Sequence, residues 1–424
     1  MGKLKIQHLR WYIVVLLCFS SIINYLDRQT LSVLAKTLQK ELHFDNVQYS
    51  YMTTSFLVSY IIMYAVSGRL MDRLGTRRGF ALFHTGWSIV TVLHSLGRSV
   101  LHFSFFRFLL GATEPANFPG GVKAVSEWFP MKERALAIGI FNSGTAIGNM
   151  LALPIVSFVA LAWGWRWAFV VTGAVGFVWV LVWLLFYRLP GGHPNISEAE
   201  RELITSGDSQ EVEAGTRVSI RTLLSMKETW GCIAARFFTD PISYFLAFWI
   251  PNYFQQERGF NLLDLGKLVW IPYAVAALGN IAAGAIPRYL IYRGWSLNRA
   301  RKSTMLVISC LMPVFCLMVT QVGSWAVALV LVSAISFGHA AWGNIILPAE
   351  VFPRRVVGSV SGFGGALGSV AGAATQPLIG WAVQTLSYTP VFAAISGVYL
   401  VAFLLVHFLI GELGVIRRVA AEKV

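Results

Sequence analysis

The feature that most constrains this chain is a series of apolar runs, each about 20 residues long, separated by short polar segments. A helix of that length spans a hydrocarbon core of roughly 30 Å. The runs are continuous rather than alternating, and lipid offers no partner to backbone amides, so they predict transmembrane helices rather than a barrel. Only 13% of the residues are charged, about half the share of a soluble domain. We therefore expect an all-α integral membrane protein.

Twelve such runs can be placed along the chain. The longest polar stretch covers 189–228 and leaves six runs on either side. We expect an N-terminal six-helix bundle over 1–188, a cytoplasmic linker over 189–228 and a C-terminal six-helix bundle over 229–424. Within the linker, Ser197 and Glu200 have the spacing of a capping box and predict a short helix. The predicted spans cover residues 11–35, 47–70, 78–96, 98–122, 135–160, 167–188, 229–252, 263–287, 303–321, 325–350, 357–382 and 388–411.

Basic residues are distributed unequally between the two sides of the predicted membrane. Loops on the side of the N-terminus hold 24 of the 34 lysines and arginines, whereas the opposite loops hold six. The positive-inside rule then places both termini in the cytoplasm, which requires an even number of spans. The net charge of +14 therefore reflects topology rather than nucleic-acid binding. We expect a multi-pass protein of the cell (inner) membrane that acts as a monomer.

Motifs of enzymes, cofactors and metals are missing from the sequence. It contains no GxSxG, HExxH, Walker or Rossmann pattern. The four cysteines all fall in predicted spans and form no CxxC pair, so we expect buried thiols. The sequence therefore argues against an enzyme, a nucleotide-driven pump, a cofactor or a metal site.

The two halves echo each other in sequence. Glu127-Trp128-Phe129-Pro130 recurs as Glu350-Val351-Phe352-Pro353, an offset of 223 residues. Each copy is followed by basic residues and a glycine-rich span, and small residues four apart let helices approach closely in lipid. Such a repeat predicts two parallel bundles related by an axis normal to the membrane. The glycines are Gly139, Gly144 and Gly148 in the first half, and Gly362, Gly364, Gly368 and Gly372 in the second.

The loop between the second and third spans reads Gly68-Arg-Leu-Met-Asp72-Arg73-Leu-Gly75-Thr-Arg77-Arg78. It resembles the signature loop of the major facilitator superfamily at every fixed position. The corresponding loop of the second half departs from the pattern, because Arg288 stands where an acid is expected. Any latch in that half must be made differently.

A narrower resemblance, covering nearly the whole chain, is to the anion–cation symporter branch of that superfamily, and within it to bacterial hexuronate and galactonate transporters. The segments that carry it are Asn24–Arg28, Arg107–Ala116, Pro251–Phe254, Arg236–Phe238 and Phe337–His339. The resemblance implies secondary active import of a small organic anion, such as a hexuronate or aldonate, by proton symport with alternating access. It also implies that Asp27 and Glu114 carry the proton, and that the signature loop, with Gly68, Asp72, Arg73, Gly75 and Arg77, belongs to the gate.

Several charges fall inside predicted spans, where each costs about 2.5–3.5 kcal/mol on insertion scales. Arg107 and Glu114 are two helical turns apart and therefore share a face. Asp27 and Arg28 are adjacent and diverge by about 100° around their helix. One layout turns Arg28 toward a central cavity and Asp27 toward the fourth span, where Arg107 forms a structural ion pair with it. Glu114 is then free to titrate.

Arginine matches a carboxylate bidentately and is always charged, so we assign the substrate carboxylate to Arg28 and Arg236. One arginine lies in each half, and a shared anion would tie the halves together. Polar side chains in neighbouring spans would contact sugar hydroxyls. These predicted substrate-binding residues are Tyr25, Tyr60, Thr145, His339 and Asn344.

Three alternatives remain open at this point. The intramembrane charges could be ion pairs that only fix helix packing. The chain could carry a different anion, as an organophosphate antiporter or a carrier of other mono- or dicarboxylates, although the buried acids Asp27 and Glu114 disfavour phosphate exchange. It could also be a receptor that does not transport.

Overall fold

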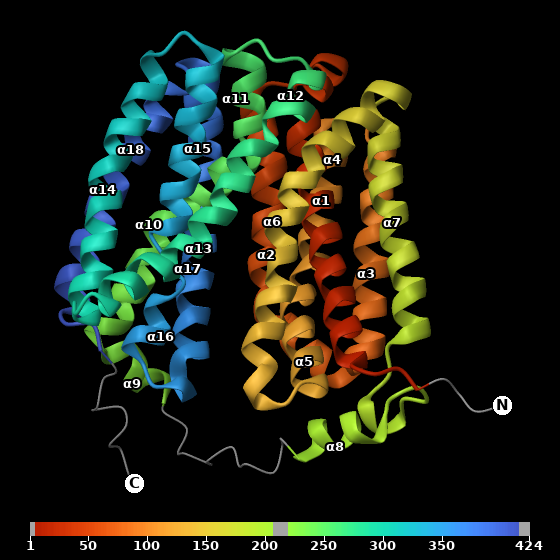
Figure 1. The fold of residues 1–424 in the computed structure, drawn as a ribbon. Coiled ribbons are helices and arrows are strands. Elements are labelled where there is room, and N and C mark those ends of the chain that lie inside the picture. Colours follow the sequence, from red (N-terminus) through yellow and green to blue (C-terminus); the bar gives the residue numbers. More distant parts are fainter. Residues whose placement is uncertain (1–4, 207–218, 415–424) are drawn as a thin grey trace. The chain divides into compact units, whose positions relative to one another are not determined.

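A computed structural model of the 424-residue chain describes residues 5–206 and 219–414. This part of the protein is built from α-helices with three short 3-10 turns (Figure 1). The α-helices are α1 (Leu9–Leu42), α2 (Asn46–Leu74), α3 (Thr76–Leu93), α4 (Val100–Thr113), α5 (Asn117–Trp128), α6 (Met131–Trp163), α7 (Trp165–Phe186), α8 (Glu198–Ser206), α9 (Ile220–Ser225), α10 (Lys227–Phe248), α11 (Ile250–Glu257), α12 (Leu262–Leu268), α13 (Trp270–Tyr292), α14 (Leu297–Gln321), α15 (Trp325–Ala341), α16 (Leu347–Val351), α17 (Arg354–Thr385) and α18 (Thr389–Ile410). The 3-10 turns are η1 (His94–Leu96), η2 (Glu114–Ala116) and η3 (Pro190–Gly192).

Helices cover all twelve predicted spans, which confirms the all-α, twelve-helix fold. Among the described residues, seven helices are individually long and apolar enough to cross a membrane, and a bent α2 makes eight. Several of the remaining spans are built from shorter pieces, such as α4 with α5 and α15 with α16. Others, such as α10, contain charged residues within the apolar run, including Arg236.

The fourth span is interrupted where Pro115 follows Glu114. Proline has no backbone N–H to continue the ladder of α4, and its ring conflicts with the preceding turn. The chain therefore ends α4 at Thr113, forms the tight turn η2 and restarts as α5. Glu114 still has α-helical dihedral angles, and its amide donates to the carbonyl of Leu110, so it continues the helical face that carries Arg107.

The chain forms two compact units. The first contains residues 1–43 and 58–213, and the second contains 44–57 and 214–424. Residues 44–57, which include the first turns of α2, belong to the second unit because of specific contacts there. Tyr49 donates its hydroxyl to the carbonyl of Phe248 at 2.8 Å, and Thr53 donates to Gln376 at 3.2 Å.

Within each unit the first helix packs against the glycine-rich helix, α1 against α6 and α10 against α17 (Figure 1). Gly144 and Gly148 of α6 lie against the backbone of α1. A methyl group at Gly148 would stand 2.5 Å from the carbonyl oxygen of Ile22. Only glycine permits this approach, as the repeat predicted.

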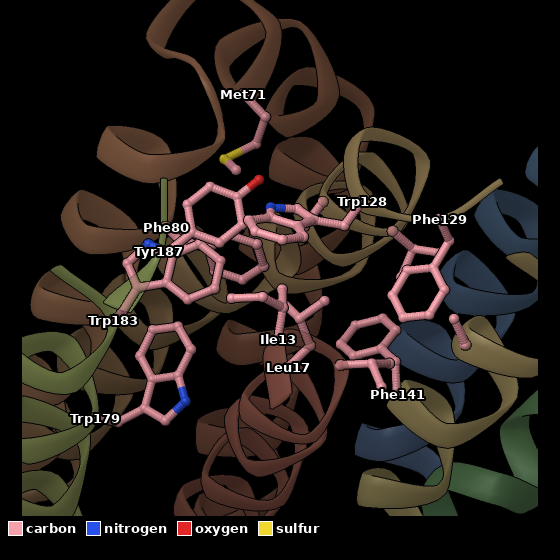
Figure 2. Packing of buried hydrophobic residues seen from close by; sticks show 14 of the residues in the cluster. Ile13, Leu17, Met71, Phe80, Trp128, Phe129, Phe141, Trp179, Trp183 and Tyr187 are labelled. Atoms are coloured by element: carbon pink, nitrogen blue, oxygen red, sulfur yellow. The ribbon is translucent and has the colours of Figure 1, made fainter. Parts of the chain in front are cut away.

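An aromatic column forms much of the core of the first unit (Figure 2). Trp179 and Trp183 of α7 and Tyr187, which directly follows that helix, recur every four residues and stack in sequence, with ring centroids 5.1 and 4.0 Å apart. Phe80 of α3 packs against Trp183. Both indoles are satisfied by carbonyl oxygens, since Trp179 donates to Leu16 and Trp183 donates to Arg77. The column therefore joins α1, α3 and α7.

The start of the linker is tied to the start of α1. Ser197 accepts a hydrogen bond from the amide of Glu200 at 3.3 Å, so one half of the predicted capping box is present. The carboxylate of Glu200 instead accepts from the amides of Leu9 and Arg10 and from the Arg10 guanidinium, at 2.9–3.0 Å. Glu200 thus caps a different helix from its own. The remainder of the linker at 207–218, and the basic residues Lys3, Arg217, Arg417, Arg418 and Lys423, lie outside the described residues.

Candidate substrate and proton site

A buried ion pair joins Arg28 of α1 to Glu114 of η2 within the first unit. Arg28 donates from Nε and Nη2 to Oε2 of Glu114, at 3.0 and 2.8 Å. Both residues are buried, with exposed fractions of 7% and 1%. The guanidinium also lies over the rings of Tyr25 and Tyr60, 4.6 and 5.0 Å from their centroids. Four of the predicted site residues are therefore in one cluster.

The expected Asp27–Arg107 ion pair is wrong in this structure, and so is the expectation that Glu114 is unpaired. Arg107 donates from Nη2 to the backbone carbonyl of Arg28 at 3.0 Å. Neither carboxylate oxygen of Asp27 has a hydrogen-bond partner among the described residues. The 100° divergence of adjacent helical residues turns Asp27 toward Thr91 of α3 and Thr172 of α7. Glu114 instead accepts from the Arg28 guanidinium, so Arg107 and Glu114 both contact Arg28 from one face of the fourth span.

Polar side chains of α1 that the sequence reading passed over extend this cluster along the helix. Gln29 donates to Asn149 of α6 at 2.9 Å, and Ser20 donates to Asn117 of α5 at 2.8 Å. Thr145, a predicted substrate contact on α6, donates instead to the carbonyl of Asn142 in its own helix, at 2.9 Å. Ser20, Asn24 and Arg28 recur every four residues along α1 and so share a face, which was the available signal for Ser20.

A second ion pair lies in the second unit, on α10. Arg236 donates from Nε and Nη2 to Oδ2 of Asp240, at 3.0 and 2.8 Å, and from Nη1 to the carbonyl of Ser361 at 3.2 Å. Asn344, in the turn after α15, donates to Oδ1 of Asp240 at 3.1 Å and to Thr239 at 2.7 Å. The structure therefore brings two predicted substrate-binding residues, Arg236 and Asn344, onto the same carboxylate.

His339 of α15 bridges two hydroxyl groups of the second unit. Its Nε2 lies 2.7 Å from Ser243 Oγ, and its Nδ1 lies 2.6 Å from the hydroxyl of Tyr399. Close by in sequence on α10, Tyr244 shares a hydrogen bond of 3.0 Å with Ser369 of α17. The sequence reading missed Ser243, Tyr244 and Ser369, although Arg236, Asp240 and Tyr244 recur every four residues and so share one face of α10.

The glycines of α17 make room for that face. A methyl group at Gly365 would stand 2.6 Å from Nη1 of Arg236, and one at Gly368 would stand 2.3 Å from Oδ2 of Asp240. A methyl group at Gly372 would stand 2.3 Å from the ring of Tyr244. In this half the glycine repeat thus accommodates polar side chains.

The signature loop forms a turn stabilised by several latches. Gly75 has φ +72°, a conformation that favours glycine, and caps the start of α3. Asp72 accepts from Lys123 at 2.7 Å, and Arg77 donates to the carbonyl of Leu184. A methyl group at Gly68 would stand 3.9 Å from Cβ of Pro119, and Arg73 is exposed.

The glutamates of the repeated motif, Glu127 and Glu350, each accept hydrogen bonds from side chains of their own unit. Glu127 accepts from Thr76 at 2.8 Å and from the hydroxyl of Tyr187. Its counterpart Glu350 is bound bidentately by Arg301, with Nε 2.8 Å from Oε2. The second half therefore has an ion pair of its own, between Arg301 and Glu350. Because Arg288 replaces the expected acid, we expected any such interaction in that half to involve other residues.

The all-α, twelve-span fold, with an arginine–carboxylate pair within each unit, is that of a multi-pass membrane transporter rather than an enzyme. The chain belongs to the Major Facilitator Superfamily, whose family model matches residues 17–375. Across the part of the chain that the structure covers, no group of three or more His, Cys, Asp or Glu could hold a metal ion.

Curated relatives agree with this membership. The chain is 32% identical over 397 residues to the hexuronate transporter of Escherichia coli K12, covering 92% of each chain. It is 39% identical over 285 residues to the galacturonate transporter of Dickeya chrysanthemi, covering 67% of this chain and 83% of that one. Among solved structures, a bacterial homologue of the human lysosomal transporter Spinster, inward-facing and unoccupied, matches with a TM-score of 0.74 at 18% identity, covering 96% and 95% of the two chains. This last likeness concerns the fold alone.

Proposed function

We propose that the protein imports a sugar acid, such as a hexuronate or aldonate, by proton symport with alternating access. The buried Arg28–Glu114 pair is the observation that carries this proposal. The relatives named hexuronate and galacturonate transporters support the substrate class. We place the protein in the cell (inner) membrane as a monomer, with both termini in the cytoplasm.

The pair offers a route from substrate binding to proton binding. A guanidinium as buried as that of Arg28 requires an anionic partner, and Glu114 supplies it. A substrate carboxylate that binds Arg28 competes with Glu114 for the same donors. A buried carboxylate that loses its arginine is stabilised by taking up a proton. Substrate and proton would therefore be bound together.

Asp27 is the second proton site in this proposal. It is 1% exposed and within electrostatic range of Glu114 and Arg107. Its two oxygens lack hydrogen-bond partners among the residues described, and a protonated carboxyl is the form that tolerates such surroundings best. Protonation of Asp27 would also remove the repulsion between the two acids.

In this proposal, polar side chains around these charged residues bind the hydroxyl groups of the sugar acid. Tyr25 and Tyr60 flank the Arg28 guanidinium and present both an aromatic face and a hydroxyl. Thr145, His339 and Asn344 are proposed to contact sugar hydroxyls by exchanging the hydrogen bonds that they make within their own units. The latches at Asp72 and Glu350 would break and re-form as access alternates.

Uptake by purified protein in proteoliposomes tests the proposal. Labelled D-galacturonate should accumulate when the outside is made acidic, and a protonophore should abolish the accumulation. Glu114→Gln should bind substrate but lose gradient-driven accumulation, because the amide cannot carry a proton. Glu198→Gln, an exposed acid on α8, is the matched control and should transport normally.

Two outcomes would contradict the proposal. Uptake that ignores the pH gradient would remove proton coupling while leaving sugar-acid transport intact. Full gradient-driven accumulation by Glu114→Gln would remove Glu114 from the coupling step. Competition with unlabelled aldonates, dicarboxylates and sugar phosphates in counterflow would define the anion class.

A further inference from the structure

The hydroxyl group of Tyr399 is enclosed in the second unit and has one hydrogen-bond partner among the described residues. Tyr399, on α18, is 0% exposed. Its hydroxyl oxygen lies 2.6 Å from Nδ1 of His339, on α15. A phenol carries one proton, and a buried donor that is left without an acceptor is costly. The proton of Tyr399 is therefore donated to Nδ1 of His339.

Buried side chains of neighbouring elements hold Tyr399 in this position. Ser309 of α14 donates to the backbone carbonyl of Tyr399 at 3.1 Å, and the indole of Trp342 donates to Ser309 at 2.9 Å. Trp342, which directly follows α15, also packs edge-on against the ring of Tyr399, with centroids 5.8 Å apart. Ser309 and Trp342 are both buried. The phenol is thus held on more than one side, with its hydroxyl against His339.

Donation by Tyr399 sets the direction of a second hydrogen bond, on the other side of the imidazole. In a neutral imidazole one nitrogen donates and the other accepts, so an accepting Nδ1 leaves the proton on Nε2. The neutral form fits the surroundings, because both ring nitrogens contact hydroxyl groups rather than a carboxylate. Nε2 lies 2.7 Å from Oγ of Ser243, on α10. Ser243 therefore accepts from His339 and keeps its own hydroxyl proton available.

Ser243 is exposed and lies beside a proposed substrate-binding cluster of the same unit. Asp240 and Ser243 are three residues apart, so they are neighbours on the surface of α10. Asp240 is held by Arg236 and Asn344. In the part of the chain that the structure describes, His339 is the only hydrogen-bond partner of Ser243. An exposed hydroxyl whose oxygen already accepts a hydrogen bond presents its proton to a ligand at this face.

We infer that Ser243 donates a hydrogen bond to an acceptor oxygen of the sugar acid, and that Tyr399 sets this polarity through His339. His339 and Tyr399 are positioning residues and do not touch the ligand. This inference rests on the proposed function, and it makes the contribution of His339 to sugar binding indirect. In the reverse chain Ser243 would donate to His339, and the buried proton of Tyr399 would lack an acceptor.

Nitrogen-15 NMR of purified protein labelled at histidine reads the tautomer of His339 directly. Loss of one pair of signals in His339→Gln assigns the ring. We expect a protonated Nε2 and an unprotonated Nδ1, and Tyr399→Phe should shift the Nδ1 signal most, because it removes the donor at that nitrogen. A protonated Nδ1 in the wild-type protein, in a neutral ring or in an imidazolium, would overturn the inference.

Binding of D-galacturonate, measured by isothermal titration calorimetry, tests the contact with the ligand. Ser243→Ala should weaken binding roughly two- to tenfold, the effect of losing one hydrogen bond. His339→Leu should cause the same loss, because a serine hydroxyl released in a helix turns to the carbonyl one turn earlier. His339→Gln should recover most of the affinity, since its side-chain amide can donate to Ser243 in place of Nε2. Combining Ser243→Ala with His339→Leu should add no further loss.

The matched control is Ser225→Ala, which removes an exposed hydroxyl on α9 of the same unit and should bind as the wild type does. Wild-type affinity of Ser243→Ala would overturn the contact, and so would a His339→Gln variant as weak as His339→Leu. Losses that add in the double variant would show that His339 acts independently of Ser243, which also contradicts the inference. Size-exclusion profiles and thermal unfolding show whether each variant folds. Absence of binding by the wild-type protein would instead contradict the proposed function, whereas the tautomer is measured without ligand.

Discussion

Replacing Gly148 by alanine should push α1 away from α6. The added methyl group would stand 2.5 Å from the carbonyl oxygen of Ile22 and 2.9 Å from Cβ of Tyr25. An ordinary carbon–oxygen contact is about 3.3–3.6 Å, so the helices must separate by close to 1 Å. The obstacle is backbone, which cannot rotate aside as a flexible side chain can. Tyr25 and, one turn further, Arg28 would move with α1.

The size of the effect follows from two opposing contributions. Alanine is a better helix former than glycine by about 1 kcal/mol. Forcing an extra methyl group into a close-packed contact typically costs about 1–3 kcal/mol. Because neither neighbour can yield, we expect the upper half of that range and a net loss of about 1–2 kcal/mol in the free energy of unfolding. Substrate affinity should fall as well, because Arg28 is displaced.

The same helix offers a matched control. Gly139 has no atom within 4 Å of an added methyl group, so Gly139→Ala should be neutral or stabilising. Thermal unfolding of the two purified variants, together with D-galacturonate uptake, measures the difference. If Gly148→Ala proves as stable and as active as Gly139→Ala, the close approach of α1 and α6 does not position Arg28 in the way described.

Three further predictions concern parts of the molecule away from the site. Glu200→Gln should loosen the docking of α8 by about 2–3 kcal/mol, because it weakens three hydrogen bonds to the first turn of α1, and limited proteolysis of the linker should show it. The exposed Glu198→Gln should change proteolysis little, and equal effects would refute the capping role. Arg301→Lys should lower the thermal unfolding temperature, because lysine cannot hold Glu350 bidentately, and an unchanged temperature would show that the latch is unimportant. Burial lowers the pKa of His193 below 6.5, so its contribution to stability is present above pH 6.5 and is lost as the pH falls. Stability measured from pH 7 to pH 5 should therefore drop more in wild type than in His193→Gln, and parallel curves would contradict this.

The spans could be predicted from the sequence because apolar length is a local property that lipid enforces. The close approach at Gly148 was equally predictable from the sequence, since it depends on glycine itself. The 100° divergence of Asp27 and Arg28 follows from helix geometry and is seen in their different neighbours. Local rules therefore gave the elements and the residues of the candidate site.

The pairing of those residues could not be predicted, because it depends on how the helices pack. Arg107 and Glu114 share a face of the fourth span, but their spacing does not show that Arg107 binds the backbone carbonyl of Arg28 while Glu114 binds its guanidinium. Glu200 has the spacing of a local capping box, yet its carboxylate binds the start of α1, 190 residues away in sequence. In the same way, residues 44–57 join the second unit through contacts that no sequence pattern shows.

The most direct test of proton symport is whether the substrate alone can move protons. Wild-type protein is reconstituted in proteoliposomes that contain a trapped pH-sensitive dye, with no imposed pH gradient. Addition of D-galacturonate outside should acidify the interior, and Glu114→Gln should abolish this acidification while retaining binding. Entry of labelled D-galacturonate without any change of internal pH would contradict the account.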